Sequence, residues 1–307
     1  MNIVFLDAMT LGKSDLGAID RLGNLTIYPF TAPEECVERA KLAEIVITNK
    51  VVLDKEILQQ LPKLRLICVA ATGMNNIDLD AAKERNIAVK NVAGYSTASV
   101  AQHTVMLALG LLGRTSYYDA YIKSGQYCKS PVFVNLDHDP IDIEGKNWGI
   151  IGMGSIGRKV AGIAQALGAN VSYYLREGGK VYPFVSHNLH DLLRTCHIVS
   201  IHAPLNAQTQ GLIGASELAL LQDGAVLLNL GRGGIVDEAA LAHELAKRPL
   251  YAGLDVFEKE PLPSGNPLLS SGIPSERLLL TPHIAWGYVQ SRERLIAGIV
   301  ENIKSLN

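Results

Sequence analysis

Three polar residues in the second half of the chain are of the types that move protons and hold carboxylates. Arg232 lies between glycines, Glu260 precedes a proline and His283 follows one, each shortly after an apolar run. A histidine suits general acid–base work, and a carboxylate hydrogen-bonded to it would hold its orientation and favour its protonated form. The planar fork of an arginine suits a substrate carboxylate.

Together these residue types suit hydride transfer between a nicotinamide and a 2-hydroxy acid. His283 would exchange the hydroxyl proton, Glu260 would orient His283, and Arg232 would clamp the carboxylate and polarise the carbonyl. Taken singly, Glu260 also fits a surface ion pair and His283 a core histidine. His103, in an apolar stretch, is expected to be a structural helix histidine.

A glycine-rich stretch predicts where the nicotinamide cofactor would bind. The apolar run Trp148–Ile151 leads into G-x-G-x-x-G, an amphipathic helix follows, and Asn170–Leu175 is a second β-branched and aromatic run. In this context Gly152 makes the tight turn, Gly154 admits a pyrophosphate and Gly157 lets helix and strand pack closely. The motif alone is weak, but strand–turn–helix–strand around it favours a dinucleotide site.

The end of that second strand bears on the choice of cofactor. An acidic residue about 20 positions after the glycine motif ordinarily holds the adenosine ribose, whereas an arginine can accept a 2′-phosphate. This chain has Leu175 at the expected position and Arg176 beside it, which predicts that NADPH is accepted and preferred. The alternative is a solvated Arg176 with Glu177 holding the ribose of NADH.

The alternation of strands and helices predicts an α/β fold with parallel sheets. In the first hundred residues we expect a small unit of this kind, in which Thr31 and Glu34 form a capping box that begins a helix reaching about Leu42. A long helix from Ser96 or Ser99 to about Ser124 is expected to cross into a second domain. The closing helix, about Tyr288 to Ser305, is long enough to return to the first.

Length, composition and charge exclude several classes of protein. The 307 residues suggest about two domains, and a net charge of −2 with no basic run argues against nucleic acid or an anionic membrane as partner. The longest apolar run, near Val105–Leu112, is far shorter than the ~20 residues of a membrane span. Because the chain enters a strand at once, we expect no signal peptide and a cytoplasmic protein.

The cysteines point to the same compartment. The four residues Cys36, Cys68, Cys128 and Cys196 are scattered without C-x-x-C spacing, and two of them lie in or beside apolar strands. We therefore expect reduced thiols and no structural metal site.

The segment 125–147, with its acidic cluster, suits either a subunit contact or a solvated loop.

With these motifs in place, the chain resembles the D-isomer-specific 2-hydroxyacid dehydrogenases over essentially its whole length. The matching stretches are Gly152–Gly157, Asn229–Asp237, Asp255–Pro261 and Thr281–His283. The resemblance implies two doubly wound parallel-sheet domains, usually in a homodimer. A flavodoxin-like substrate domain would comprise residues 1–98 and 284–307, and a Rossmann-like NAD(P)-binding domain, 99–283, would be inserted in it.

The resemblance also implies which residues bind the ligands. Cofactor contacts are expected from Thr104, Gly152, Gly154, Ser155, Ile156, Gly157, Arg176, Ala203, Pro204, Leu230, Gly231, Arg232, Asp255, His283 and Ala285. Substrate contacts are expected from Lys50, Ala71, Thr72, Gly73, Arg232, His283 and Trp286, the 71–73 loop acting through backbone N–H groups. From residue types alone, Thr72 and Gly73 fit ordinary turn residues equally well.

Within the family the chain is most similar to the glycerate dehydrogenases, also called hydroxypyruvate reductases. The stretches that carry this similarity are Ile47–Lys50, Ala71–Asp78, Asn91–Thr97 and His283–Trp286. The expected reaction is reduction of hydroxypyruvate to D-glycerate, with glyoxylate or another 2-keto acid as alternatives.

A formate dehydrogenase is disfavoured because its histidine pairs with glutamine, whereas a dinucleotide-sensing protein like the C-terminal-binding corepressors stays open. His197, where an aspartate is common, is expected to matter little.

Overall fold

The computed structural model describes residues 1–176 and 178–306 of the chain, which forms two compact units. Unit 1 consists of residues 1–96 and 286–307, and unit 2 is the continuous stretch 97–285. The bounds expected from the sequence were 1–98 with 284–307, and 99–283.

Unit 1 contains a five-stranded, wholly parallel sheet in the order β2-β1-β3-β4-β5. This is the flavodoxin-like order of doubly wound sheets. Its strands are β1 (Asn2–Phe5), β2 (Asn24–Ile27), β3 (Ile45–Thr48), β4 (Leu66–Val69) and β5 (Ala88–Lys90). Its helices are η1 (Ala8–Leu11), α1 (Gly17–Asp20), η2 (Pro33–Glu35), α2 (Cys36–Ala40), α3 (Lys55–Gln59), α4 (Leu79–Glu84) and α11 (Val289–Lys304).

Each face of this sheet has its own apolar core because successive side chains of a strand point to opposite faces. Ile3 and Phe5 of β1 pack in one cluster with α1 and the apolar side of α11. Val4, with Leu6 just after the strand, packs in the other with α2, α3 and α4. The closing helix therefore belongs to unit 1, as the sequence predicted.

One helix start in unit 1 was predicted wrongly. The Thr31 hydroxyl caps no helix but donates to the Leu6 carbonyl at 2.5 Å. The N-cap is Ala32, whose N–H donates to Oε2 of Glu35, not Glu34, at 2.9 Å. The first turn is the 3-10 helix η2, and α2 ends at Ala40. A buried carbonyl that needed a donor decided where Thr31 points.

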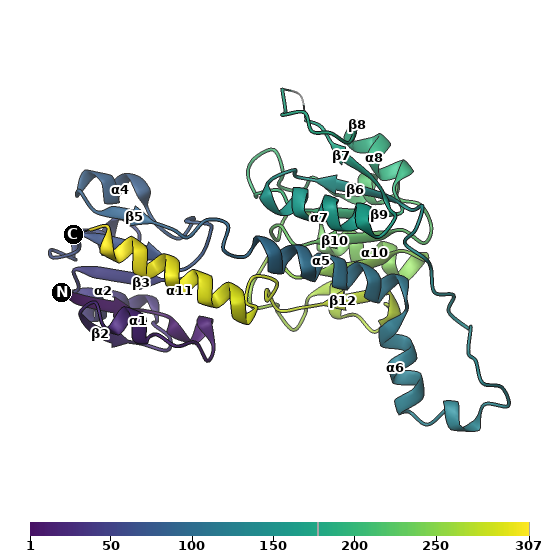
Figure 1. The fold of residues 1–307 in the computed structure, drawn as a ribbon, viewed down its shortest axis with the longest axis horizontal. Helices are drawn as coiled ribbons and strands as arrows, with labels where there is room; N and C mark the ends of the chain where they lie inside the picture. The colour runs from purple at the N-terminus through teal and green to yellow at the C-terminus, as the bar shows by residue number, and fades with distance from the viewer. Residues whose placement is uncertain (177, 307) are drawn as a thin grey trace. The chain divides into compact units, whose positions relative to one another are not determined.

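Unit 2 contains a seven-stranded, wholly parallel sheet in the order β12-β11-β10-β9-β6-β7-β8 (Figure 1). Its strands are β6 (Asn147–Ile151), β7 (Asn170–Tyr174), β8 (Val185–His187), β9 (Ile198–Ile201), β10 (Val226–Asn229), β11 (Tyr251–Leu254) and β12 (Leu278–Leu280). The order in which successive strands are added changes side between β6 and β9, which makes this the topological switch point where doubly wound folds bind nucleotides.

Helices cover both faces of the second sheet. α5 (Thr97–Leu112) and α7 (Ser155–Ala166) lie on one face. α8 (Leu189–Thr195), α9 (Ala215–Leu218) and α10 (Glu238–Lys247) form an apolar core with the strands on the other. The remaining helical segments are α6 (Thr115–Lys123), η3 (Tyr127–Lys129), η4 (Pro267–Leu269) and η5 (Ser275–Arg277).

The single long helix expected from Ser96 or Ser99 to Ser124 is wrong, because it is broken between α5 and α6. Arg114 adopts a left-handed φ of 54°, and its guanidinium turns back to donate to the Leu111 carbonyl at 2.6 Å. The same group lies 3.7 Å from the ring centroid of Tyr251, and its burial lowers the pKa of Arg114. A buried arginine that closes the end of α5 thus prevents the helix from continuing.

The described residues give two further findings on the expectations from composition. The four cysteines are free, and burial raises the pKa of Cys36 to about 11 and that of Cys68 to about 12. No helix in the described ranges is long and apolar enough to cross a membrane.

Candidate active site

The glycine loop of unit 2 joins β6 to α7 at the switch point of the sheet. Gly152 has a φ of 99°, and a Cβ there would lie 2.7 Å from the backbone nitrogen of Ala203. A Cβ on Gly157 would lie 2.1 Å from the Gly152 carbonyl oxygen. Only glycine fits these two positions, as the sequence predicted for a tight turn and a close helix.

The start of α7 has the properties of an anion site. Its N-cap, Gly154, makes no side-chain cap, and its first turn, which begins at Ser155, contains no acidic residue. Among the residues that the structure describes, nothing lies within 4 Å of where a Cβ on Gly154 would stand, so the approach to the helix end is open. The unpaired N–H groups and the positive end of the helix dipole therefore suit the pyrophosphate of a dinucleotide.

Several other expected cofactor residues follow β9 and β10 or lie in the core beside them. A Cβ on Gly231 would lie 2.8 Å from the Ala203 carbonyl oxygen, so these two loops touch through their main chains. Leu230 is buried, whereas Pro204 is exposed. Thr104 is fully buried in α5, and its hydroxyl donates to the Val100 carbonyl at 2.7 Å.

Arg176 follows β7 at the same carboxyl edge of the sheet and is exposed. Its Nη1 donates to Oε1 of Gln208, in the loop after β9. The amide is neutral, so the contact orients the guanidinium without cancelling its charge. Sequence reasoning missed Gln208, which carries no motif of its own. Glu177, the alternative ribose ligand, lies outside the described residues.

His283 and Glu260 form the hydrogen-bonded pair that the sequence predicted. Nδ1 of His283 lies 2.7 Å from Oε2 of Glu260, and the two side chains are 24% and 33% exposed. Oε1 of Glu260 accepts the Phe257 N–H at 3.0 Å, which fixes the carboxylate. Because Glu260 occupies Nδ1, the other ring nitrogen of His283, Nε2, is the one left for exchanging a proton.

Asp255 holds the loop that carries His283. Its Oδ1 accepts the Thr281 hydroxyl at 2.5 Å and the Ile284 N–H at 2.9 Å, and its Oδ2 accepts the Ala285 N–H at 2.9 Å. His103 is buried behind this loop, with Nε2 3.0 Å from the Thr281 hydroxyl, and burial lowers the pKa of His103. Asp255 and His103 thus support the loop from inside the unit.

Arg232 lies in a loop held by a buried amide. Asn229 donates from Nδ2 to the Arg232 carbonyl at 2.9 Å and accepts the Gly231 N–H at 3.1 Å. The Arg232 guanidinium, partly exposed, donates to the Gly231 carbonyl at 2.8 Å. A Cβ on Gly233 would lie 1.8 Å from the Phe257 carbonyl oxygen, so the arginine loop abuts the loop that leads to Glu260.

The expected substrate residues Lys50, Ala71, Thr72 and Gly73 belong to unit 1, where they follow the neighbouring strands β3 and β4. Within the described part of the chain, the N–H groups of Thr72 and Gly73 donate to no protein acceptor, so they are available to an anion.

Two further contacts in unit 1 concern expected substrate residues. The buried carboxylate of Asp7 accepts the Lys50 N–H at 2.6 Å and the Asn49 N–H at 2.9 Å, which fixes the loop after β3. The expected substrate residue Trp286 packs edge-on against Tyr95, with ring centroids 6.3 Å apart.

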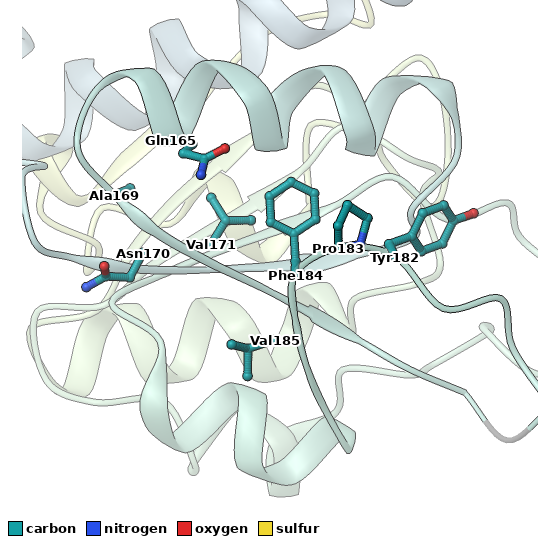
Figure 2. A pocket seen from close by; sticks show the side chains of 8 residues that line it. All are labelled: Gln165, Ala169, Asn170, Val171, Tyr182, Pro183, Phe184 and Val185. Carbon is teal, nitrogen blue, oxygen red and sulfur yellow. The ribbon is translucent and has the colours of Figure 1, made fainter.

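A separate surface cavity of about 530 Å³ lies beside β7 and β8 of unit 2 (Figure 2). Asn170 and Val171, at the amino-terminal end of β7, form part of its wall with Tyr182 and Phe184. The expected ligand residues follow the carboxyl ends of the strands, and none of them lines this cavity. It is therefore not the candidate site.

A parallel sheet with a glycine loop at its switch point, and a histidine–glutamate pair at the same edge, is the arrangement expected of a dinucleotide-dependent oxidoreductase. The family model described as the NAD-binding domain of the D-isomer specific 2-hydroxyacid dehydrogenases matches residues 105–285. The chain belongs to this family, and it is an oxidoreductase that uses a nicotinamide dinucleotide and a small 2-hydroxy acid.

Individual relatives agree with this assignment. The chain is 34% identical to a hydroxypyruvate reductase of Blautia hydrogenotrophica, over 99% of this chain and 96% of the relative. It is 37% identical to a glycerate dehydrogenase of Methylorubrum extorquens, over 89% and 85%. A solved structure of an acyclic imino acid reductase in complex with NADPH and D-Arg superposes with a TM-score of 0.85 at 28% identity, over 99% and 96%.

Proposed function

We propose that the protein reduces hydroxypyruvate to D-glycerate, with glyoxylate as a second substrate. The observation that carries the proposal is the 2.7 Å contact between His283 and Glu260, which provides a proton donor beside the nucleotide edge of unit 2. The two relatives named for hydroxypyruvate and glycerate support this choice of 2-keto acid.

Each residue then has a definite task. Nε2 of His283 gives a proton to the keto oxygen as it becomes a hydroxyl, and Glu260 stabilises the protonated ring. Arg232 binds the substrate carboxylate through its planar fork and polarises the carbonyl. From unit 1, the N–H groups of Thr72 and Gly73 and the side chains of Lys50 and Trp286 are proposed as further substrate ligands. Gly152–Gly157 would hold the dinucleotide, which would supply the hydride.

The test is hydroxypyruvate-dependent oxidation of NADPH and of NADH by the purified protein, followed by the absorbance of the reduced nicotinamide. We expect turnover with hydroxypyruvate, slower turnover with glyoxylate, and D-glycerate as the product. A protein that binds the dinucleotide tightly but turns over neither acid would instead fit the corepressor-like class.

We propose further that NADPH is preferred, because Arg176 lies exposed at the nucleotide edge and its hydrogen-bond partner, Gln208, is neutral. Arg176→Ala should lower kcat/KM for NADPH about tenfold or more and leave that for NADH nearly unchanged, as expected for loss of a charged hydrogen bond. Arg194 is an exposed arginine on α8, and Arg194→Ala is the matched control. NADH winning clearly in the wild type, or a ratio unchanged in Arg176→Ala, would show that Arg176 does not bind the phosphate.

We also propose a homodimer. α6 has no buried residue, and it leads into a segment that extends from the sheet of unit 2 (Figure 1). That segment exposes Phe133 by 88%, Val132 by 57% and Leu136 by 62%. A second copy would cover such an apolar stretch. Light scattering should give twice the mass of the chain, and Phe133→Glu should shift it toward the monomer.

Cytoplasmic location and the lack of a nucleic-acid partner complete the proposal. Four free thiols suit a reducing compartment, and a net charge of −2 gives no electrostatic footprint for nucleic acid. Fractionation of the source cells and a binding assay with duplex DNA would check the two statements.

A further inference from the structure

A buried carboxylate outside the proposed catalytic set joins the arginine and glutamate loops. Glu238, the first residue of α10, is 8% exposed. Its Oε1 accepts the Glu258 N–H at 2.6 Å, and its Oε2 accepts Nδ2 of Asn266 at 2.6 Å. Both partners belong to the loop that contains Glu260.

Glu238 is not needed to begin its helix. Asp237 is the N-cap, and its Oδ1 accepts the Ala240 N–H at 2.9 Å. The side chain of Glu238 is directed to the neighbouring loop instead, where it holds one backbone group and one amide. Asn266 is itself fixed, because its Oδ1 accepts the Leu268 N–H at 2.9 Å.

The position of this contact connects two parts of the proposed site. Glu238 follows the arginine loop directly along the chain, and Glu258 precedes Glu260 in the glutamate loop. The main chains of the same two loops already meet where Gly233 abuts the Phe257 carbonyl. The carboxylate therefore fixes the second loop against the first at two further points, on either side of Glu260.

We propose that Glu238 is a positioning residue of the active site, which holds the Glu260 loop in the place where Glu260 can orient His283. This rests on the proposed roles of Glu260 and His283. Glu238 touches neither substrate nor cofactor in this scheme, and it acts through Glu260 alone.

The chemistry of the contact makes a sharp test possible. Both groups that face Glu238 are donors, and a carboxylate offers an acceptor oxygen to each. In Glu238→Gln one of them would meet an amide NH₂, donor against donor. Adding Asn266→Asp would restore the pairing, because the new glutamine could donate to the aspartate while still accepting from Glu258.

The experiment compares Glu238→Gln, the double variant Glu238→Gln/Asn266→Asp and wild type in hydroxypyruvate reduction. We expect kcat to fall roughly 10- to 100-fold in the single variant, as misplacement of a catalytic group does, and to recover most of this loss in the double variant. The Kd for the reduced dinucleotide, from its fluorescence, should change little. Glu244→Gln is the matched control on the same helix, and it should keep wild-type kcat.

Glu260→Gln, measured in parallel, separates this inference from the proposed function. If Glu260→Gln is slow while Glu238→Gln turns over like wild type, the positioning role is wrong and the proposed function stands. If Glu260→Gln turns over like wild type, the proposed role of Glu260 is wrong, and the positioning role of Glu238 is wrong with it. If the wild type itself does not turn over hydroxypyruvate, the proposed function is wrong. A folded double variant as slow as the single one, or a loss of dinucleotide affinity parallel to the loss of kcat, would also overturn the positioning role.

Discussion

At the scale of single residues, the proposed chemistry depends on which ring nitrogen of His283 is occupied. Glu260 takes Nδ1 at 2.7 Å, and the left-handed φ of 53° at His283 sets the direction in which the ring leaves the chain. The buried carboxylate of Asp255 accepts three hydrogen bonds from the same loop and so holds it in place. The imidazole is therefore oriented by two carboxylates, one partly exposed and one buried.

His283→Ala tests this arrangement. Loss of a general acid should reduce kcat by roughly 10²- to 10⁴-fold, while the affinity for the dinucleotide stays nearly intact because its glycine loop is untouched. Steady-state kinetics with hydroxypyruvate and a binding titration measure the two quantities. Turnover close to wild type would refute the assignment of His283.

Arg232→Lys tests the carboxylate clamp. A lysine keeps the positive charge but lacks the planar fork, so KM for hydroxypyruvate should rise and kcat should fall, together about tenfold or more in kcat/KM. Unchanged kinetics would mean that the fork of Arg232 does not bind the substrate.

Residue types and spacing predicted the histidine–glutamate pair because both residues stand in short motifs after strands. Glu238 was missed for a physical reason. An acidic residue in the first turn of a helix is expected from the helix dipole alone, so nothing in the sequence separated it from an ordinary helix start. Only its burial, with donors from a loop distant along the chain, shows the difference.

At the scale of elements, the central strands could be predicted because they are continuous apolar runs buried on both faces. Edge strands β2 and β8 were missed because they lack such runs: Ile27 is 47% exposed and Val185 is 62% exposed. The break between α5 and α6 was missed as well. Gly113 was a visible signal there, but the contact of Arg114 with Tyr251 joins residues far apart in the sequence.

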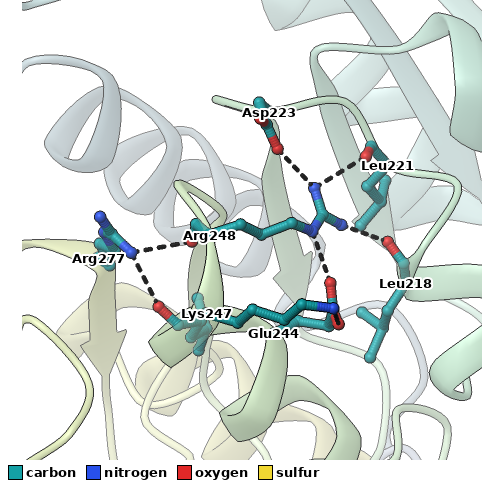
Figure 3. A network of polar contacts seen from close by, with 8 residues as sticks. Leu218, Leu221, Asp223, Glu244, Lys247, Arg248 and Arg277 are labelled. Atoms are coloured by element: carbon teal, nitrogen blue, oxygen red, sulfur yellow. Dashed lines mark hydrogen bonds and ion pairs between the residues drawn. The ribbon is translucent and has the colours of Figure 1, made fainter.

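Arg248 ties three elements of unit 2 together (Figure 3). Its guanidinium pairs with Glu244 of α10 at 2.5 Å. It also donates to the carbonyl of Leu218, the last residue of α9, at 2.6 Å and to that of Leu221, which follows the helix, at 3.0 Å. Its own carbonyl accepts Nη1 of Arg277, in η5, at 2.9 Å. The Leu218 carbonyl also accepts the Leu221 N–H at 3.1 Å, so within the described residues it is the Leu221 carbonyl that depends on Arg248 for its partner.

Arg248→Met should therefore lower the free energy of unfolding by about 2–3 kcal/mol, since several charged hydrogen bonds are lost and the Leu221 carbonyl is left without its donor. Arg194→Met, which removes a 3.8 Å exposed ion pair with Asp191, should cost less than about 0.5 kcal/mol. Urea denaturation of both variants measures the difference, and equal losses would contradict the role of this network. The kcat of either folded variant should remain that of wild type.

At the scale of the whole molecule, three histidines of unit 2 are expected to make folding sensitive to mild acid. Burial lowers the pKa of His103, of His197 and, to about 3, of His202. Nδ1 of His202 has no hydrogen-bond partner among the described residues, and Nε2 lies 3.1 Å from the Ser200 hydroxyl. The folded protein therefore keeps this ring neutral where the unfolded chain would protonate it.

The sign of the pH dependence follows from that difference. Below pH 6.5 the unfolded state binds more protons, so stability is fully present above 6.5 and falls toward pH 3. Between about pH 7 and 5.5, His202 alone should cost roughly 1 kcal/mol of unfolding free energy. His202→Gln, which keeps a donor for Ser200, should flatten this slope in urea denaturation at constant protein concentration. An equally steep slope in the variant would exclude His202 as its source.

The close approach of Gly233 to Phe257 also has a consequence for engineering. The loops that carry Arg232 and Glu260 contact each other through their main chains. A library that randomises side chains in these loops would therefore change the functional groups at the site but not the distance between the two main chains. Variants selected for new keto acids should therefore keep glycine at position 233. Larger substrates would have to be accommodated by remodelling elsewhere, with this pair of loops retained as a fixed frame.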